Sequence, residues 1–466
     1  MTLDSRVDLI TTGNLRKALF SLAVPAVLMM IGIMLFEIID MFWVGRTNES
    51  GTAAVSAATY IIWTIKSLAI LAGTGINTLI GRTAGAKNWS RVGDWLWRGI
   101  TLALSLSLIF GAVGMFYLQD ILSFMQLKPE TMDLSYHYLV YFFISLPFVF
   151  LFGVFESTFR ALGDTRTPFI ITTIALAFNT VADPLLIFGW LGFPQMGVPG
   201  SALATLMAHV IAVLLFILRF SRSTLNLTFR FPWNNLFREW WQIIKIGSPI
   251  AFSGALFSVI YIFITRIVSL ASVMGVEDPL LAARQIDINI SAMGVGQRWE
   301  SLVYYTCVAV SAAVATLVSQ NLGSGNIERA KASAYMAVRY LLIYTGIISI
   351  FFIFFGETLG YILMPDPAVA EATARYLFVI GIFEITMSFE FGLEGAFIGS
   401  GNTVPAFLIS FPLTALRVPL AWYLAIEMDL GVEAIWWTLG ITMLLKGVLF
   451  ALWFYRGKWV HAKVLT

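Results

Sequence analysis

Residues 18–43 read ALFSLAVPAVLMMIGIMLFEIIDMFW, an apolar run in which only Glu37 and Asp40 carry charge. About 20 apolar residues cross the hydrocarbon core of a bilayer as a helix, so this run is long enough to span a membrane. It lacks a small-residue cleavage site and continues too far for a signal peptide. We therefore interpret it as the first membrane-spanning helix.

The composition of the whole chain agrees with this first run. Of 466 residues, 59% are hydrophobic and 12% are charged, and the mean hydropathy is +0.84. Soluble domains carry about a quarter charged residues because water covers their surface. Most of this surface must therefore face lipid. Long continuous apolar runs favour helices over a transmembrane barrel, whose strands alternate over about ten residues.

Eleven further segments show the same pattern. They are 54–80, 95–117, 134–159, 168–189, 198–218, 246–271, 301–320, 333–356, 374–398, 404–426 and 434–455. The sequence thus predicts an all-α polytopic membrane protein with twelve transmembrane helices in two pseudo-symmetric six-helix bundles.

The distribution of Lys and Arg predicts the orientation of these helices. If the N-terminus is cytoplasmic, nineteen basic residues fall in inner segments and four, namely Arg46, Lys128, Arg284 and Arg298, in outer ones. Cytoplasmic segments of membrane proteins carry the excess of Lys and Arg. We expect a multi-pass protein of the plasma (cell inner) membrane with both termini in the cytoplasm.

An internal repeat supports the division into halves. The pattern Thr78-Leu79, Gly85, Asn88, Arg91 returns as Thr316-Leu317, Gly323, Asn326, Arg329, and every pair is 238 residues apart. An even number of helices per half makes the halves parallel, a type of repeat found in carriers. We predict an N-terminal lobe over 1–218, a cytoplasmic linker over 219–245 and a C-terminal lobe over 246–466.

Several classes of function find no support in the sequence. A net charge of +2 gives no reason to expect a nucleic-acid partner, and the single cysteine, Cys307, excludes an internal disulfide or a cysteine-based metal cluster. No GxxxxGK[ST] stretch or paired His and carboxylate motif occurs. We expect no enzyme activity and no cofactor. The expected partners are the lipid bilayer and a small organic substrate, and we expect a monomer.

Four stretches of sequence resemble one family of transporters. They are RALGDTRTP at 160–168, FEIIDMFWVG at 36–45, NTVADP at 179–184 and GSALAT at 200–205. Together they resemble the multidrug and toxic compound extrusion (MATE) family over nearly the whole chain. The resemblance implies a two-lobed bundle that exports organic, often cationic, compounds in exchange for H⁺ or Na⁺.

The same resemblance implies a cation site in the first lobe. In the DinF-like branch of the family this site uses residues that match Asp40, Asn179, Asp183 and Thr205. The NorM-like branch stresses a second-lobe Glu on helix 7, but the expected helix 7 over 246–271 has no acidic residue. The chain is therefore more similar to the DinF-like branch.

The residues themselves support a shared site. A carboxylate in hydrocarbon costs about 2.5–3.5 kcal/mol on insertion scales, so Asp40 and Asp183 should face a cavity or a partner. Asn179 lies four residues before Asp183, on the same helix face. Pro184 removes an N–H and frees the carbonyl of Thr180. Two carboxylates that approach each other cannot both ionise at low cost, so the site is suited to binding H⁺ or Na⁺.

Other interpretations of these four residues are open. Asp40 could lie at the outer headgroups, and Asp183-Pro184 could be only a helix-breaking pair. Asn179 and Thr205 could serve as hydrogen-bonding residues between helices.

Further intramembrane charges are candidates for substrate binding. In the second half these are Glu384 and Glu390, which either attract a cationic substrate or pair within the bundle with Arg266, Arg417 or Lys446. In the first half Glu37 shares the Asp40 cavity or extends to the interface, and Lys66 pairs with Asp40 or with a substrate anion.

We therefore expect a cation-coupled antiporter that works by alternating access, with Pro25 and Pro184 as candidate bending points. The alternatives are a lipid-linked oligosaccharide or lipid flippase of the same superfamily, a channel, and, least favoured, a membrane enzyme. Flippases of this kind usually carry extra helices and a strongly basic cavity.

Overall fold

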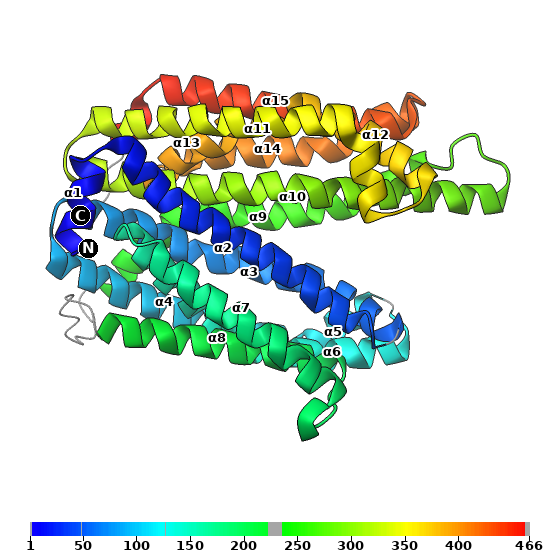
Figure 1. Cartoon of the computed structure of the whole chain (residues 1–466), viewed down its shortest axis with the longest axis horizontal. Coiled ribbons are helices and arrows are strands. Elements are labelled where there is room, and N and C mark those ends of the chain that lie inside the picture. Colours follow the sequence, from blue (N-terminus) through cyan, green and yellow to red (C-terminus); the bar gives the residue numbers. More distant parts are fainter. Residues whose placement is uncertain (1, 48, 126, 222–234, 462–466) are drawn as a thin grey trace. The chain divides into compact units, whose positions relative to one another are not determined.

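The computed structural model of the protein describes residues 2–47, 49–125, 127–221 and 235–461, and their regular elements are all helices (Figure 1). The α-helices are α1 (Leu3–Thr11), α2 (Leu15–Val44), α3 (Glu49–Gly85), α4 (Trp89–Phe116), α5 (Leu118–Phe124), α6 (Pro129–Ala161), α7 (Arg166–Phe188), α8 (Val198–Ser221), α9 (Leu236–Ala271), α10 (Pro279–Gly323), α11 (Ile327–Leu363), α12 (Pro367–Glu384), α13 (Met387–Ser400), α14 (Val404–Trp422) and α15 (Gly431–Tyr455). Three shorter helical turns are η1 (Trp190–Gly192), η2 (Tyr423–Glu427) and η3 (Lys458–His461).

The expected fold class is confirmed. Within the described ranges, 11 helices are long and apolar enough to cross a membrane, and the bent pair α12 and α13 makes up to 12. The sequence predicted one continuous helix over 374–398. Instead, the chain bends by 50° between Glu384 and Met387, so this span is broken inside the apolar run.

Two helices are longer than predicted. Helix α10 begins at Pro279, although its first turns carry Arg284 and Asp287 and had been assigned to an outer connection. Helix α9 begins at Leu236, inside the expected linker. Polar helix ends can extend beyond the apolar core, and hydropathy alone does not register them. Residues 222–234 of the expected linker lie outside the described residues.

The described chain forms two compact units. Unit 1 contains the residues up to Ala255 together with Ser319–Ile327, and unit 2 contains Leu256–Val318 and 328–461. Helices α9 and α10 therefore each contribute to both units. The lobe boundaries inferred from the sequence stay a prediction.

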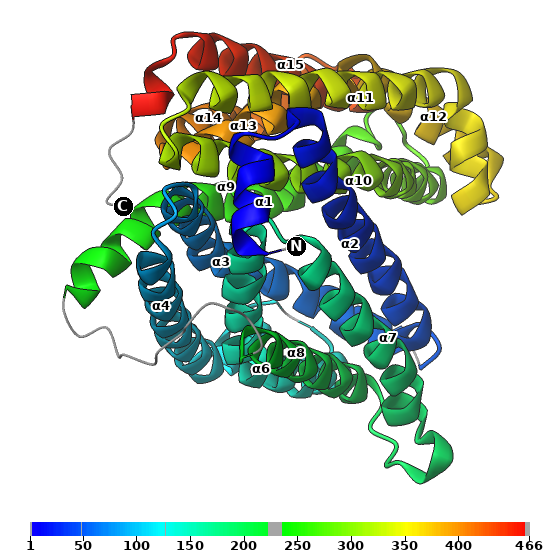
Figure 2. The same cartoon turned by 60° about the vertical axis from the view of Figure 1, so that its left-hand side comes forward.

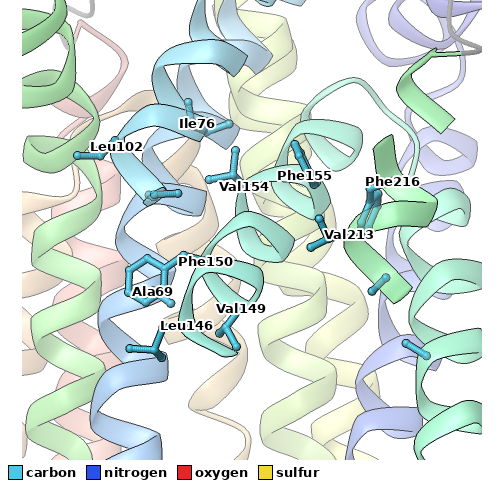
Figure 3. Close-up of a cluster of buried hydrophobic side chains, with 14 of the residues drawn as sticks. Ala69, Ile76, Leu102, Leu146, Val149, Phe150, Val154, Phe155, Val213 and Phe216 are labelled. Atoms are coloured by element: carbon cyan, nitrogen blue, oxygen red, sulfur yellow. The ribbon is translucent and has the colours of Figure 1, made fainter. Parts of the chain in front are cut away.

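Helix α6 forms the centre of the apolar core of unit 1 (Figure 3). Its Phe150 and Val154 lie beside Ala69 and Ile76 of α3, and its Phe155 lies beside Phe216 of α8, with ring centroids 6.0 Å apart. Burying such side chains stabilises a helix pair through close packing. Figure 2 shows the helices of this unit from a second side.

The repeated glycines allow two helices of unit 1 to cross at very short range. A Cβ atom on Gly85 would lie 2.0 Å from the carbonyl oxygen of Gln320, and one on Gly323 would lie 2.0 Å from that of Arg82. The two contacts are equivalent under the 238-residue repeat. Only a residue without a side chain permits such a close backbone approach.

Polar contacts attach the start of α9 to α4 within unit 1. Glu239 is buried and forms ion pairs with Arg91, at 2.6 Å, and with Arg98. The indole N–H of Trp240 donates to Thr101 Oγ1 at 3.1 Å. These contacts hold the polar first turns of α9 against α4.

Helix α1 contacts two loops of unit 1. Arg6 forms an ion pair with Asp164 at 2.6 Å, and Asp8 forms one with Lys87 at 2.8 Å. The hydrogen bond between Lys87 and Asp8 raises the pKa of the Lys87 ammonium above its ordinary value. This short helix therefore joins the loops before α4 and before α7.

In unit 2, helix α15 packs against α12, α13 and α14. The glycines of α13 bring it close to its neighbours. A Cβ on Gly395 would lie 2.3 Å from the carbonyl oxygen of Ser311 in α10. Helix α13 is therefore held in the interior of this unit, together with the acidic residues that it carries.

Candidate functional site

Helices α7 and α8 form an antiparallel pair that carries three of the predicted site residues (Figure 1). At the start of α7, Asp164 accepts a hydrogen bond from the backbone N–H of Thr167 at 3.1 Å. At its end, Gly189 adopts φ +73°, a left-handed conformation that favours glycine and terminates the helix. The chain then turns back, and the N–H of Met196 donates to the carbonyl of Leu186 at 2.9 Å.

Asn179 and Thr205 meet across this helix pair. The Asn179 side-chain amide donates to Thr205 Oγ1 at 3.3 Å, which leaves its own carbonyl oxygen Oδ1 buried without a hydrogen bond in the described structure. One turn further along α8, His209 Nδ1 lies 2.8 Å from the backbone carbonyl of Thr205. The predicted proximity of Asn179 and Thr205 is therefore present.

Asp40 of α2 and Asp183 of α7 also come together. Their carboxyl groups interact directly with each other. Asp183 is fully buried, and within the described residues neither of its oxygens, nor Oδ1 of Asp40, has a hydrogen-bond partner. Asp183 lies one helical turn after Asn179 on α7, so the acid pair and the Asn179–Thr205 contact are neighbours in unit 1.

Two further polar residues of this region were missed by the sequence analysis. The hydroxyl groups of Ser201, on α8, and Tyr138, on α6, both interact with the Asp40 carboxyl group. Tyr138 lies in a run of aromatic residues that reads as ordinary core. Ser201 lies four residues before Thr205, and this spacing predicts that both lie on the same face of the helix.

The two predicted first-lobe substrate residues lie at the edge of the same region. Glu37 and Lys66 are both exposed, and both interact electrostatically with Asp40. Lys66 also interacts with His209. The proximity of Lys66 and Asp40 is therefore present, whereas their role in substrate binding stays a prediction.

The chemistry of the region favours a cation. Four buried oxygens lack a hydrogen bond within the described chain: Oδ1 of Asp40, both carboxylate oxygens of Asp183 and Oδ1 of Asn179. Ionised carboxylates and amide carbonyls can only accept hydrogen bonds. Buried polar groups without partners call for an explanation such as an ion or a proton. Hard cations take oxygen ligands of this kind.

Unit 2 contains a buried acidic residue with a counter-charge of its own. Lys446 of α15 donates to Glu390 Oε1 of α13 at 3.2 Å, and both side chains are buried. Glu394, one turn further along α13, interacts with both of them. The alternative in which Glu390 pairs within the bundle is therefore the one observed, and a substrate-binding role for Glu390 is left as a prediction.

Glu384 stands apart from this pair. It is fully buried, and neither of its oxygens forms a hydrogen bond within the described structure. It interacts with Glu300 of α10, which accepts a hydrogen bond from the Tyr376 hydroxyl at 2.8 Å. Arg417, one of the expected partners of Glu384, donates from its Nε to the hydroxyl of Thr442 at 2.9 Å. The sequence does not point to Glu300, because it directly precedes the span predicted over 301–320.

Many apolar helices of spanning length that carry buried acidic residues are typical of a helical membrane transport protein. The family model named MatE matches residues 25–185 and 249–423. The chain therefore belongs to the multidrug and toxic compound extrusion (MATE) family, whose members are transporters and not enzymes.

Several curated proteins are similar to the chain over nearly their whole length. A probable multidrug resistance protein NorM of Thermotoga maritima is 28% identical over 461 residues, which cover 97% of this chain and 95% of that protein. The FAD transporter of Shewanella oneidensis is 26% identical, covering 93% and 92%. A probable multidrug resistance protein YpnP of Bacillus subtilis is 27% identical, covering 98% of both chains.

Solved structures share the fold. An outward-facing multidrug resistance MATE family transporter superposes with a TM-score of 0.87 at 19% identity, covering 98% of this chain and 99% of the other. A MOP superfamily transporter from Pyrococcus furiosus superposes with a TM-score of 0.86 at 19% identity and the same coverage. At this identity the likeness concerns the fold. The placement near the DinF-like branch stays a prediction.

Proposed function

We propose that this membrane transporter exports organic compounds in exchange for a cation, H⁺ or Na⁺, that binds at Asp40, Asn179, Asp183 and Thr205. The observation that supports the proposal most strongly is the meeting of Asp40 and Asp183 in a region with buried oxygens that have no hydrogen-bond donor. A mobile cation would supply the missing positive charge. A carboxylate inside a spanning bundle marks an ion or proton pathway more often than a structural element.

The exchange cycle follows from the missing positive charge at the Asp40–Asp183 pair. Cation uptake from the outer side neutralises the pair and favours release of the substrate, and cation release on the inner side prepares the site for the next substrate. A ligand shifts such an equilibrium only by its differential affinity for the two states. The bending points that we propose are Pro25 in α2 and Pro184 in α7, since proline removes a helical hydrogen bond.

The proposed substrates are organic cations or amphiphiles. Several relatives are named multidrug resistance proteins, which supports this class, and another relative is named FAD transporter, so a substrate screen should include FAD beside cationic dyes. The flippase alternative is not favoured, because the described residues contain at most 12 candidate spans and the chain matches the MatE family. The proposed location is the plasma membrane, with cytoplasmic termini.

The proposal is tested by transport in proteoliposomes with H⁺ and Na⁺ gradients imposed independently. Gradient-driven dye efflux should fall at least about tenfold in Asp40→Asn and Asp183→Asn, within the range of known coupling free energies. Asp133→Asn is the matched control, because Asp133 is an exposed acid of α6 whose side chain is 72% accessible. If efflux in both site variants equals that of the control, the cation site is wrongly assigned.

A further inference from the structure

Lys66 is a lysine inside a spanning helix. It lies on α3 within the run IIWTIKSLAIL at 61–71, and it is the one charged residue of that run. A charge on a spanning helix faces a partner or an aqueous space, because hydrocarbon does not solvate it. Lys66 is exposed, and it interacts electrostatically with Asp40 of α2 and with His209 of α8. Its ammonium group therefore faces the interior of unit 1 rather than lipid.

The imidazole of His209 is fixed at one ring nitrogen and free at the other. Its Nδ1 lies 2.8 Å from the backbone carbonyl of Thr205, and a carbonyl only accepts, so Nδ1 carries the hydrogen. The ring of Phe152, on α6, lies edge to face with the imidazole, with centroids 6.1 Å apart. The side chain is half-buried, and within the described residues its Nε2 forms no hydrogen bond. Nε2 is therefore available to a ligand.

The two basic residues and the acid pair lie along one stretch of helix α8. Ser201 marks the level of the acids, because it interacts with Asp40. His209 follows eight residues later, a rise of about 12 Å along the helix. The long side chain of Lys66 interacts with Asp40 and with His209. This part of unit 1 thus carries negative charge at one end and basic groups at the other.

This distribution of charge selects a class of compound. A compound with only negative charge would be repelled by Asp40 and Asp183, because charges in a region of low dielectric interact strongly. A compound with only positive charge would leave Lys66 without a partner. A compound that carries both a cationic centre and an anionic group matches both ends. The partly exposed ring of Phe152 offers an apolar face to an aromatic body between the two groups.

We propose, on the basis of the export function above, that Lys66 and His209 form a substrate subsite for the carboxylate of an amphoteric organic compound. The Lys66 ammonium donates to this carboxylate in a charge-assisted hydrogen bond, which is stronger than a neutral one. A proton taken from solution by Nε2 of His209 lets the ring donate as well, since both nitrogens of an imidazolium are donors. The cationic centre of the same compound lies toward Asp40 and Asp183, where the coupling cation replaces it.

Rhodamine B and its ethyl ester test this subsite. Both dyes carry the same cationic ring system, and only rhodamine B has a free carboxylate. Fluorescence polarisation gives the Kd of each dye for purified protein in detergent, with protein-free micelles as the blank and no ion gradient. The ratio of the ester Kd to the rhodamine B Kd measures the preference for the carboxylate, and it should exceed one in the wild type.

Removal of either basic group should lower this ratio. We expect a fall of about tenfold in Lys66→Gln, which corresponds to one charge-assisted hydrogen bond, and of about threefold in His209→Leu. The Kd of the ester should stay within about twofold of the wild type, because the ester makes no charged contact with the subsite. The neighbouring titratable groups Glu37, Tyr138 and Asp183 stay in place in both variants.

Two control variants separate charge from structure. Lys66→Arg retains the positive charge and should keep most of the preference for rhodamine B. Lys331→Gln removes a lysine at the start of α11, in unit 2, which pairs with Glu328 at 2.8 Å, and should leave the ratio unchanged. If Lys66→Gln does not fold, His209→Leu decides the test.

Three results would overturn the proposal. They are a wild type without a preference for rhodamine B, an unchanged ratio in Lys66→Gln and His209→Leu, and an equal fall of the ratio in Lys331→Gln. Gradient-driven dye efflux in Asp183→Asn keeps this proposal distinct from the cation site. If efflux falls in Asp183→Asn while Lys66→Gln and His209→Leu keep the ratio, only the subsite is wrong. If the ratio falls while Asp183→Asn transports as the wild type does, the subsite is right and the cation site is wrong.

Discussion

Two buried acidic sites, one in each unit, differ in whether the protein supplies a buried counter-charge. In unit 1, Asp40 and Asp183 lie beside the Asn179 amide and the Ser201 hydroxyl, and Lys66, the lysine that interacts with Asp40, is exposed. In unit 2, Glu390 has the Lys446 ammonium at 3.2 Å. A buried charge is costly unless a partner compensates it. Glu390 has its counter-charge within the protein, whereas we expect Asp40 and Asp183 to take a cation from solution.

The largest expected effect comes from breaking the pair of unit 2. In Lys446→Met, Glu390 keeps a buried charge without its partner, and we expect a loss of about 3–5 kcal/mol in the free energy of unfolding. Asp183→Asn removes a buried charge that has no counter-charge, so the unfolding temperature of this variant should not fall. Thermal unfolding of both variants in the same detergent measures the difference.

The double variant Glu390→Gln/Lys446→Met sharpens this test. It removes both charges together and should recover part of the stability that Lys446→Met loses. If Asp183→Asn is destabilised as strongly as Lys446→Met, the difference between the two units does not exist.

A smaller effect is expected at Asp164, an acid of unit 1 that has its own counter-charge. Asp164 is buried, forms an ion pair with Arg6 and accepts the backbone N–H of Thr167. Asp164→Ala should cost about 1–3 kcal/mol of stability, because it leaves a charged partner and a helix N-terminus without an acceptor. Asp164→Asn retains a capping oxygen and should cost less. Equal losses in the two variants, measured by thermal unfolding, would mean that the cap contributes nothing.

The smallest effect is expected at the exposed pair of Lys87 and Asp8. Asp8 raises the pKa of Lys87, so the pair contributes stability below the ordinary lysine pKa of 10.5 and loses it as pH rises through the raised pKa of the folded state. Lys87→Gln should therefore lower the unfolding temperature slightly at pH 7, and the difference from the wild type should vanish at strongly alkaline pH. A difference that grows with pH would contradict this assignment.

Much of the fold could be predicted because the length of a continuous apolar run strongly indicates a membrane-spanning helix. The spans follow from continuous apolar runs, and the pairing of Asn179 and Asp183 on one face follows from their spacing of four residues. The repeated Gly85 and Gly323 also proved meaningful, since both lie at the same close crossing.

What the sequence did not predict depends on three-dimensional packing. The bend after Glu384 falls at Ile385-Thr386, where no proline or glycine marks it. Glu300 lies at the polar end of a long helix and reads as part of a connection. Ser201 is a small residue whose importance depends on the helix that lies opposite, which sequence spacing on one helix does not specify.

The central claim is that Asp40 and Asp183 exchange a cation, and proton release measures this most directly. Purified protein in weakly buffered detergent solution, with a pH indicator, receives saturating Na⁺ or substrate. We predict that the wild type and Asp133→Asn release protons and that the double variant Asp40→Asn/Asp183→Asn releases none. The same release from the double variant as from the wild type would contradict the account.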